Sequence, residues 1–153
     1  MAFQSDSPTH GYEIDDDPSR LDIGAIHAFL STAYWSIGIP LDVVARAIAN
    51  SYCVGAFDAE GKQVGLVRVV TDYATFAYLC DVYVLEVHRG RGLSKRMVAH
   101  VMARPDIGPL RRLMLLTENA HGLYERYGFR PMATPERVME IRRPDAYERR
   151  GGG

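Results

Sequence analysis

Apolar and polar residues alternate with two different periods along the chain, and the change falls near residue 51. Before it, apolar residues recur at helical spacing over 17–33 and again over 40–50. Asp17 and Pro18 are typical of a helix start, because a carboxylate can cap the first turn and proline suits its first position. A short strand is predicted over 10–15. The N-terminal third therefore predicts one strand followed by two helices.

Beyond residue 51 the pattern becomes that of strands. Runs rich in β-branched and aromatic residues predict strands over 51–57, 63–71 and 76–85. Asp58–Gly61 is predicted to be a hairpin turn, with a glycine near its end. The three strands are apolar on both faces, which is typical of central strands that helices cover on both sides.

The second half mixes the two patterns. A helix is predicted from about Leu93 to about Ala103, because apolar residues again recur at helical spacing until Pro105. After it come a strand over 113–117, a helix over 119–127, a strand from Phe129 onward and a last strand over 138–142. This order predicts an α+β domain, with a mixed, mostly antiparallel sheet of six to seven strands and helices on both faces.

Length and composition agree with one globular domain. A chain of 153 residues leaves no room for two ordinary cores, and 47% hydrophobic with 24% charged residues are globular averages. We expect a single domain over 10–145, a flexible N-terminus over 1–9 and a flexible tail over 146–153.

Charge and cysteine usage argue against several classes of protein. The formal net charge of -1 disfavours a protein that coats nucleic acid. Apolar runs stay below the roughly 18 residues of a membrane helix, and no His/Cys cluster predicts a metal site. Cys53 and Cys80 lie in apolar runs typical of buried, reduced thiols, and the N-terminus lacks a signal-peptide pattern. The sequence predicts a cytoplasmic protein without metal, nucleic-acid or membrane partners.

The stretch 88–98, HRGRGLSKRMV, gathers cations and glycines where a strand gives way to a helix. A helix start leaves backbone N–H groups unpaired and carries partial positive charge, so it suits anions. Gly90 and Gly92 allow unusual φ and the close approach of a ligand, while Arg89, Arg91 and Lys95 add charge. The stretch predicts a diphosphate cradle, and a solvated turn without a ligand is the alternative. The patterns GxxxxGK[ST] and GxGxxG are both absent.

Residues 89–94, RGRGLS, resemble the R/Q-x-x-G-x-G/A signature of the GNAT superfamily of acyl-CoA-dependent N-acetyltransferases. The strand that ends at Leu85 directly precedes them, where that family has its splayed fourth strand. The segment 120–129, AHGLYERYGF, resembles the A-x-x-L-Y-x-x-x-G-F segment of the same family. The resemblance covers about 51–142 well and the two N-terminal helices more loosely, and it implies a GNAT-like fold.

The same resemblance implies acetyl-CoA as co-substrate, with the amides of the glycine turn holding its pyrophosphate. Main-chain groups on the preceding strand would contact the pantetheine arm much as an added strand does. Ser94 replaces the usual Gly/Ala, and Thr117 stands where many members carry an asparagine. Either Asn119, two residues on, substitutes for that asparagine, or its contact with the pantetheine is lost. The cofactor-binding residues implied are Tyr83, Val84, Arg89, Gly90, Arg91, Gly92, Leu93, Ser94, Lys95, Thr117, Asn119 and Tyr124.

Tyr124 is implied as the general acid that protonates the departing thiolate. A phenol with an ordinary pKa near 10 can serve as such an acid. Tyr127 lies on nearly the same helical face and is the competing phenol. Without the family spacing, Tyr124 would be interpreted as packing against Phe129.

An alkylammonium has a pKa of about 10.4, so some group must take a proton from the substrate amine before it attacks. The sequence identifies this proton acceptor less clearly. Asp81 lies in an apolar strand, where an unpaired carboxylate is costly. It is predicted as the catalytic base, as an anchor for the substrate amine, or as the ion-pair partner of Arg68. Glu86 and His121 are further candidates, and a water chain is another.

Tyr34 and Trp35 begin the loop 34–39, where the resemblance places the acceptor wall. Aromatic side chains there favour a flat acceptor or a cation–π contact with an amine, and the alternative is that they cover the core. Arg68, Asp72 and Tyr73 are the other predicted substrate-binding residues.

The sequence as a whole favours an N-acetyltransferase that uses acetyl-CoA and a small-molecule or amino-acid-like amine. The alternatives are a non-catalytic acyl-CoA-sensing domain and acetylation of a protein or peptide amine. The identity of the acceptor stays open, since the fold hosts many acceptors. A homodimer is an expectation that rests on the family resemblance alone.

Overall fold

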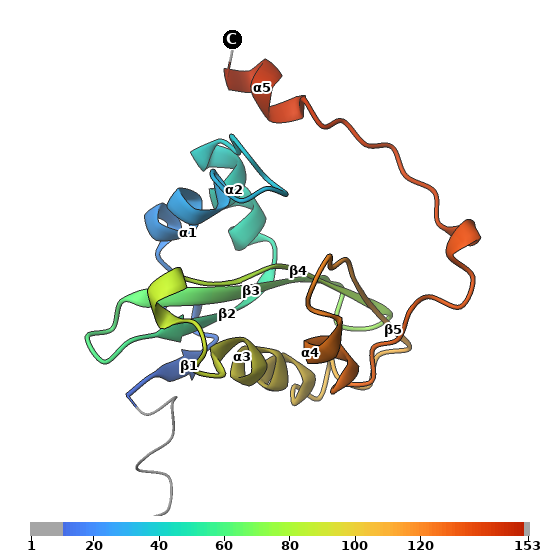
Figure 1. Ribbon diagram of the computed structural model, residues 1–153, viewed down its shortest axis with the longest axis horizontal. Helices are drawn as coiled ribbons and strands as arrows, with labels where there is room; N and C mark the ends of the chain where they lie inside the picture. Colours follow the sequence, from blue (N-terminus) through green and yellow to red (C-terminus); the bar gives the residue numbers. More distant parts are fainter. Residues whose placement is uncertain (1–10, 152–153) are drawn as a thin grey trace, which may run out of the picture.

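The computed structural model describes residues 11–151, so the predicted flexible segment 1–9 lies outside the described residues. Its centre is a five-stranded sheet in the order β1-β2-β3-β4-β5 (Figure 1). All neighbours are antiparallel except β4 and β5, which are parallel. The strands are β1 (Glu13–Asp15), β2 (Tyr52–Phe57), β3 (Gln63–Thr71), β4 (Phe76–Val84) and β5 (Arg112–Leu115).

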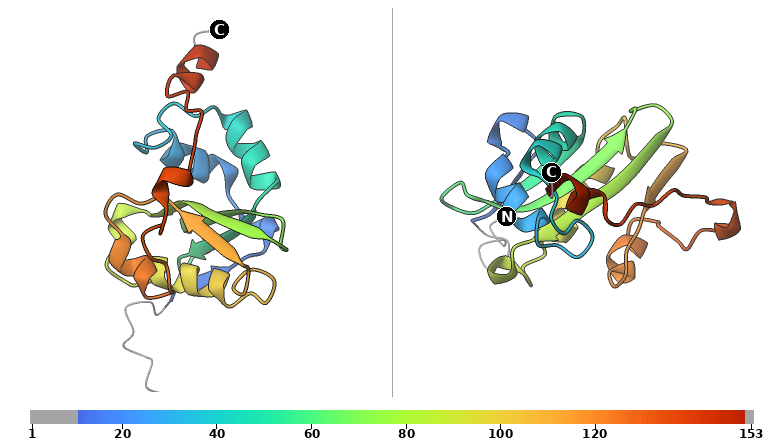
Figure 2. Two further views of the ribbon diagram at one scale, coloured as in Figure 1. Left: turned by 90° about the vertical axis from the view of Figure 1, so that its right-hand side faces the viewer. Right: turned by 90° about the horizontal axis from the view of Figure 1, so that it is seen from above.

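Helices cover both faces of this sheet. Two of them, α1 (Ile23–Leu30) and α2 (Leu41–Ala49), lie on one face, and α3 (Leu93–Met102) and α4 (His121–Glu125) lie on the other (Figures 1 and 2). The last helix, α5 (Ala146–Gly151), falls in the segment predicted to be a flexible tail. This three-layer arrangement confirms the predicted α+β class.

An apolar layer fills each side of the sheet. On the α3 side, Met97, Val98 and Ile107 are fully buried and join β2, β3 and β4 in one cluster. On the other side, Ile26 and Leu30 of α1 pack with α2 and the opposite side chains of the strands. Strands β2 to β4 therefore have buried side chains on both faces, which explains their nearly continuous apolar sequence.

The strand count is lower than predicted. The sequence predicted six to seven strands, including one from Phe129 onward and one over 138–142, but the described chain has five. All residues from 135 to 144 are exposed, and the nearby backbone bonds are local turns such as Arg137 N–H to Thr134 O. A β-strand needs a hydrogen-bonded neighbour, and within residues 11–151 no strand pairs with this segment.

The first predicted helix is also divided. Asp17 caps only a single 3-10 turn, Pro18–Arg20, by accepting from the N–H of Ser19. The chain is extended at Leu21, and Asp22 then caps α1 by accepting from Ala25 N–H at 3.0 Å. Two capping carboxylates five residues apart therefore give two short helices instead of one.

A bulge interrupts β4 close to its end. Leu66 pairs with Tyr83 and Arg68 pairs with Cys80, so two residues of β4 lie opposite one residue of β3. Asp81 is the first of these two, and its φ of 51° is left-handed. Such a bulge turns a side chain out of the regular alternation, and aspartate tolerates the left-handed region better than most residues.

We expect Ile107→Ala to lower the free energy of unfolding by about 2–5 kcal/mol, because it leaves a cavity in the fully buried α3-side cluster. Urea unfolding followed by circular dichroism measures the change. Ile37→Ala is the matched control, since Ile37 is 65% exposed and its truncation should cost less than about 0.5 kcal/mol. Equal losses in the two variants would contradict this account of the core.

Candidate functional site

The glycine turn joins β4 to α3. After the 3-10 turn Glu86–His88, Gly90 has a φ of 79° and Gly92 a φ of 75°, both left-handed. A Cβ added at Gly90 would meet no atom within 4 Å, so backbone conformation, not lack of space, favours glycine there. Gly92 immediately precedes α3, and no side chain caps the helix. The first-turn amides of α3 thus have no side-chain acceptor at the N-cap.

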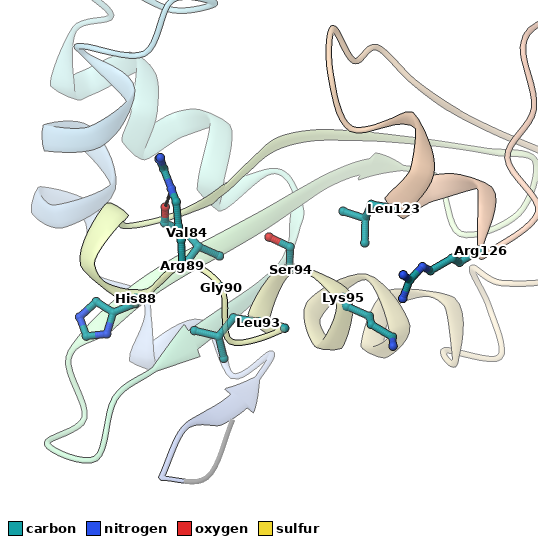
Figure 3. A pocket seen from close by; sticks show the side chains of 10 residues that line it. Val84, His88, Arg89, Gly90, Leu93, Ser94, Lys95, Leu123 and Arg126 are labelled. Carbon is teal, nitrogen blue, oxygen red and sulfur yellow. Dashed lines mark hydrogen bonds between the residues drawn. The ribbon is translucent and has the colours of Figure 1, made fainter. Parts of the chain in front are cut away.

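A cavity of about 360 Å³ lies against this turn (Figure 3). Its wall combines the start of α3 with the end of β4, with Leu123 of α4 and with Arg126, the C-cap of α4. Cations face it from two elements, because Lys95 belongs to α3 and Arg126 follows α4. The lining residues are Val84, His88, Arg89, Gly90, Gly92, Leu93, Ser94, Lys95, Leu123 and Arg126. A helix start without a side-chain cap, together with these cations, suits a phosphate-bearing ligand.

Arg89 is fixed to the strand that precedes it. Its Nε donates to the carbonyl oxygen of Val84 at 2.8 Å, which ties the glycine turn to the end of β4. The carbonyl oxygen of Val84 therefore already accepts a hydrogen bond from within the protein. The turn is further fixed through His88, whose Nδ1 lies 2.8 Å from the hydroxyl of Tyr12, and Arg91 lies over the Tyr12 ring.

The two phenols of the second motif have different surroundings. Tyr124 is 6% exposed and packs edge-on against Phe129, with ring centroids 5.9 Å apart. Burial raises the pKa of Tyr124 to about 12, so the phenol is protonated at neutral pH. Tyr127 instead donates its hydroxyl to the carbonyl oxygen of Lys95 at 2.9 Å, and so joins the end of α4 to α3. Tyr127, unlike Tyr124, therefore donates a hydrogen bond to α3, the helix that follows the glycine turn.

Asp81 is held between two donors on the α1 side of the sheet. Arg68 Nε donates to one carboxylate oxygen at 2.7 Å, and Trp35 Nε1 donates to the other at 2.8 Å. Arg68 also donates to Ser51 Oγ at 3.1 Å. The structure therefore brings together three of the residues that the sequence predicted separately, Trp35, Arg68 and Asp81.

Aromatic rings continue this cluster toward β4. Phe29 stacks on Tyr83 with ring centroids 3.9 Å apart, and Trp35 packs against Phe29 at 6.1 Å. Tyr34 packs edge-on against Trp35 and is largely exposed. The loop after α1 therefore presents two accessible rings beside the Asp81 carboxylate.

Asp72 and Tyr73 lie elsewhere. They form the β3–β4 turn, at the opposite end of β4 from Val84. The hydroxyl and N–H of Thr75 bond the Asp72 carboxylate and hold its pKa well below its usual range. Tyr73 packs against Tyr52, and Arg104 lies over its ring. The structure does not bring these two residues to the cavity or to Asp81.

Thr117 and Asn119 lie in the segment between β5 and α4. Thr117 Oγ1 accepts from the N–H of Ala120 at 3.0 Å, so this hydroxyl stabilises the start of α4. Asn119 is exposed. Neither belongs to the cavity lining, whereas Leu123 and Arg126, which the sequence analysis missed, do. Leu123 and Arg126 are three residues apart, and residues at this spacing lie on the same face of a helix. This spacing is the one sequence signal that could have placed both beside the cavity.

Cys80, the neighbour of Asp81, and Cys53 are free thiols. Burial raises the pKa of Cys80 to about 11 and that of Cys53 to about 12. Both thiols are therefore protonated at neutral pH.

Comparison with known proteins assigns this arrangement to a family. Residues 49–131 match the model of the GNAT acetyltransferase domain. A predicted acetyltransferase of Gibberella zeae is 35% identical over 133 residues, which cover 74% of this chain and 75% of that protein. The chain belongs to the GNAT family of acetyltransferases.

Solved structures support the same assignment. The crystal structure of a GNAT-family protein from Xanthomonas campestris pv. campestris is 52% identical, with a TM-score of 0.85 over 89% of this chain and 96% of that chain. A predicted acetyltransferase of Clostridium acetobutylicum, solved with acetyl-CoA, is 14% identical, with a TM-score of 0.61 over 86% and 94% of the two chains. The second likeness shows the shared fold.

As a GNAT protein the chain is an acyltransferase, and its family uses acetyl-CoA as acetyl donor. Within the described residues, no group of three or more His, Cys, Asp or Glu side chains could hold a metal ion. Over the same residues, every helix is too short or too polar to cross a bilayer.

We expect Tyr124→Phe to reduce the alkaline loss of stability of this GNAT domain. Above pH 10 the phenol ionises in the unfolded chain, while burial keeps it protonated in the folded chain until about pH 12. The unfolded state then binds fewer protons, so the free energy of unfolding falls as pH rises. Urea unfolding between about pH 9 and about pH 12 measures this, and the wild-type curve should fall more steeply. Parallel curves would show that Tyr124 ionises normally.

Proposed function

We propose that this GNAT protein transfers the acetyl group of acetyl-CoA to the primary amine of a small molecule, by direct attack of the amine on the thioester. The observation that carries the proposal is the cavity at the start of α3. It offers uncapped helix amides, left-handed glycines and cations where a diphosphate needs them, and it extends to Leu123, next to Tyr124.

In this proposal the residues from Arg89 to Lys95 hold the pyrophosphate. Val84 lines the same cavity beside Arg89, so the end of β4 directs the pantetheine arm and the acetyl carbonyl. The backbone N–H groups near Val84 supply donors for the oxyanion that forms when the amine attacks. The bond between Arg89 and Val84 O fixes the distance between these two halves of the donor site.

Tyr124 is proposed as the general acid. The neutral amine nitrogen forms a bond to the acetyl carbon, the carbon–sulfur bond breaks, and the thiolate takes the phenolic proton of Tyr124. The nitrogen then loses its extra proton, which returns through water to the Tyr124 phenolate, so the products are the neutral amide and CoA thiol. Burial keeps this phenol protonated before the reaction, as the role requires. Tyr127 is not proposed for the role, because its hydroxyl is bonded to Lys95 O.

Asp81, Trp35 and Arg68 are proposed as the acceptor site. The carboxylate is held at fixed orientation by two donors, and each oxygen can accept a further hydrogen bond from an ammonium. Trp35 and Tyr34 add exposed ring faces for a cation–π contact. Asp81 then anchors the substrate ammonium. Before the attack, the ammonium loses one proton to Asp81 or to water.

A cytoplasmic location is proposed with this function. The free thiols of Cys53 and Cys80 support it, since a reducing compartment keeps such thiols unpaired.

An amine-panel assay tests the function as a whole. Acetyl-CoA binding is measured by isothermal titration calorimetry, and the release of CoA thiol is followed with primary amines, amino acids and amine-bearing peptides. Binding with thiol release for small amines is the expected result. Absence of binding at millimolar acetyl-CoA contradicts the donor site, whereas binding without release for any amine identifies a non-catalytic acyl-CoA-binding domain.

We expect Tyr124→Phe to lower kcat by about 100-fold or more with little change in the Kd of acetyl-CoA, because the general acid acts only as the thiolate leaves. Tyr127→Phe should give the opposite pattern. It removes the bond to Lys95 O at the cradle, so it should weaken acetyl-CoA binding more than it lowers kcat. Steady-state kinetics and calorimetry on both variants measure the two effects. Equal losses of kcat and affinity in Tyr124→Phe would assign that residue to donor packing.

We expect Gly92→Asp to raise the Kd of acetyl-CoA by about tenfold or more, about 1.4 kcal/mol, because it places a carboxylate beside the phosphate cradle. Gly61→Asp is the matched control. Gly61 also has a left-handed φ, of 82°, but it lies in the β2–β3 hairpin, so the same substitution there should leave the affinity unchanged. Similar losses in the two variants would mean that strain, not charge at the cradle, causes the effect.

A further inference from the structure

Tyr12, which directly precedes β1, reaches the glycine turn from a distant part of the sequence. Its hydroxyl lies 2.8 Å from Nδ1 of His88, 76 residues away, and the two rings meet edge-on with centroids 5.7 Å apart. The guanidinium carbon of Arg91 lies 5.8 Å from the centre of the same phenol ring. One side chain of the N-terminal segment therefore contacts the turn on both sides of Gly90.

Tyr12 is itself held by the body of the molecule. Its half-buried ring packs against the α3-side cluster, and Arg96 of α3 donates to its carbonyl oxygen at 3.5 Å. The strand that follows it pairs with β2 from Glu13 to Asp15. A side chain that a strand and a helix already fix can hold a loop in place, because its own position does not depend on that loop.

The glycine turn gains its order from the side chains around its glycines. A Cβ built at Gly90 would meet no atom within 4 Å, so packing does not hold this residue, and glycine leaves the backbone many conformations. Arg89 supplies one restraint through its bond to the end of β4. His88 and Arg91 supply two more, and both of these run through Tyr12.

The contact between Tyr12 and His88 persists in both charge states of the imidazole. The phenol hydroxyl donates to Nδ1 of a neutral ring, and a protonated ring donates from Nδ1 to the phenol oxygen. His88 lines the cavity, whereas Tyr12 does not, so Tyr12 reaches a bound ligand only through the residues of the turn.

We propose that Tyr12 is a positioning residue for acetyl-CoA, which holds the glycine turn in its ligand-receiving conformation before the ligand arrives. The inference rests on the donor site proposed above. A turn that is already ordered presents its amides to the diphosphate without a further loss of conformational entropy, and this raises affinity. Tyr12 lies away from the reacting atoms, so it acts on donor binding and not on the chemical step.

Isothermal titration calorimetry with acetyl-CoA on the full chain tests this role. We expect Tyr12→Phe to raise the Kd by about threefold to tenfold, because it keeps the ring beside Arg91 and removes only the bond to His88. Tyr12→Leu removes both contacts and should raise the Kd by about tenfold or more. In the amine-panel assay, kcat at saturating acetyl-CoA should stay within about twofold of the wild type in Tyr12→Phe.

Tyr52→Phe is the matched control for a loss of stability. Tyr52 donates its hydroxyl to Asp16 at 2.7 Å, so it also ties the segment around β1 to the body, but on the side of β1 away from Tyr12. Its loss should lower the free energy of unfolding and leave the Kd of acetyl-CoA unchanged. A similar rise in Kd in Tyr52→Phe and Tyr12→Phe would mean that Tyr12 only stabilises the fold, which would overturn the proposal.

A double-mutant cycle identifies His88 as the group through which Tyr12 acts. In a His88→Ala background the phenol hydroxyl has lost its imidazole partner, so Tyr12→Phe should change the Kd by less than about twofold. An undiminished effect in that background contradicts the role.

Hydrogen exchange without ligand reads the turn directly. The amides of residues 89–93 should exchange faster in Tyr12→Leu than in the wild type, and circular dichroism checks that the variant is folded. A folded Tyr12→Leu with unchanged exchange and unchanged Kd overturns the positioning role alone. A wild type that does not bind acetyl-CoA overturns the proposed donor site, and the positioning role with it.

Discussion

The ion pair between Arg68 and Asp81 fixes the β-bulge in β4, and the geometry of the candidate site depends on this bulge. Asp81 has a left-handed φ within a β-bulge, a conformation that costs energy unless its surroundings fix it. Arg68 and Trp35 each bind one oxygen of its carboxylate, so the bulge is tied to β3 and to the loop after α1. Past the bulge, β4 ends at Val84, whose carbonyl fixes Arg89 and with it the glycine turn. The proposed donor and acceptor sides therefore both depend on the end of one strand, β4.

Positive charge gathers at the cavity beside the glycine turn, although the molecule as a whole is not basic. The chain carries a formal net charge of -1, yet the cavity is lined by Arg89, Lys95 and Arg126 together with the start of α3. Short-range fields of this kind attract an anionic ligand to one place without making the whole surface basic. The proposed acceptor side, only three residues before Val84 on β4, has a mostly buried carboxylate that is paired with Arg68.

Local sequence predicted the middle of the fold well, because there each residue's role follows from its neighbours. The strands from Tyr52 to Val84, the glycine turn and α3 all have strong periodic or turn signals, and the structure confirms them to within two residues. Asp81 illustrates what the pattern leaves open. Its carboxylate was predicted as base, anchor or ion-pair partner, and only the three-dimensional contacts identify both donors. The contact of Trp35 across 46 residues and the packing of Tyr147 on distant helices have no local signal. The strand predicted at 138–142 lacked its partner, which is a property of the assembly of strands and not of the segment alone.

The buried thiols have a chemical consequence for an enzyme that handles thioesters. Cys80 lies one residue from Asp81, yet with a pKa of about 11 its reactive thiolate is roughly one part in 10⁴ at neutral pH, and Cys53 has still less. A neighbouring thiolate would compete with the amine for the acyl group by transthioesterification and would trap the enzyme as an acyl-cysteine. In the proposed reaction, protonation of both sulfurs disfavours this side reaction and leaves the acyl group available to the amine.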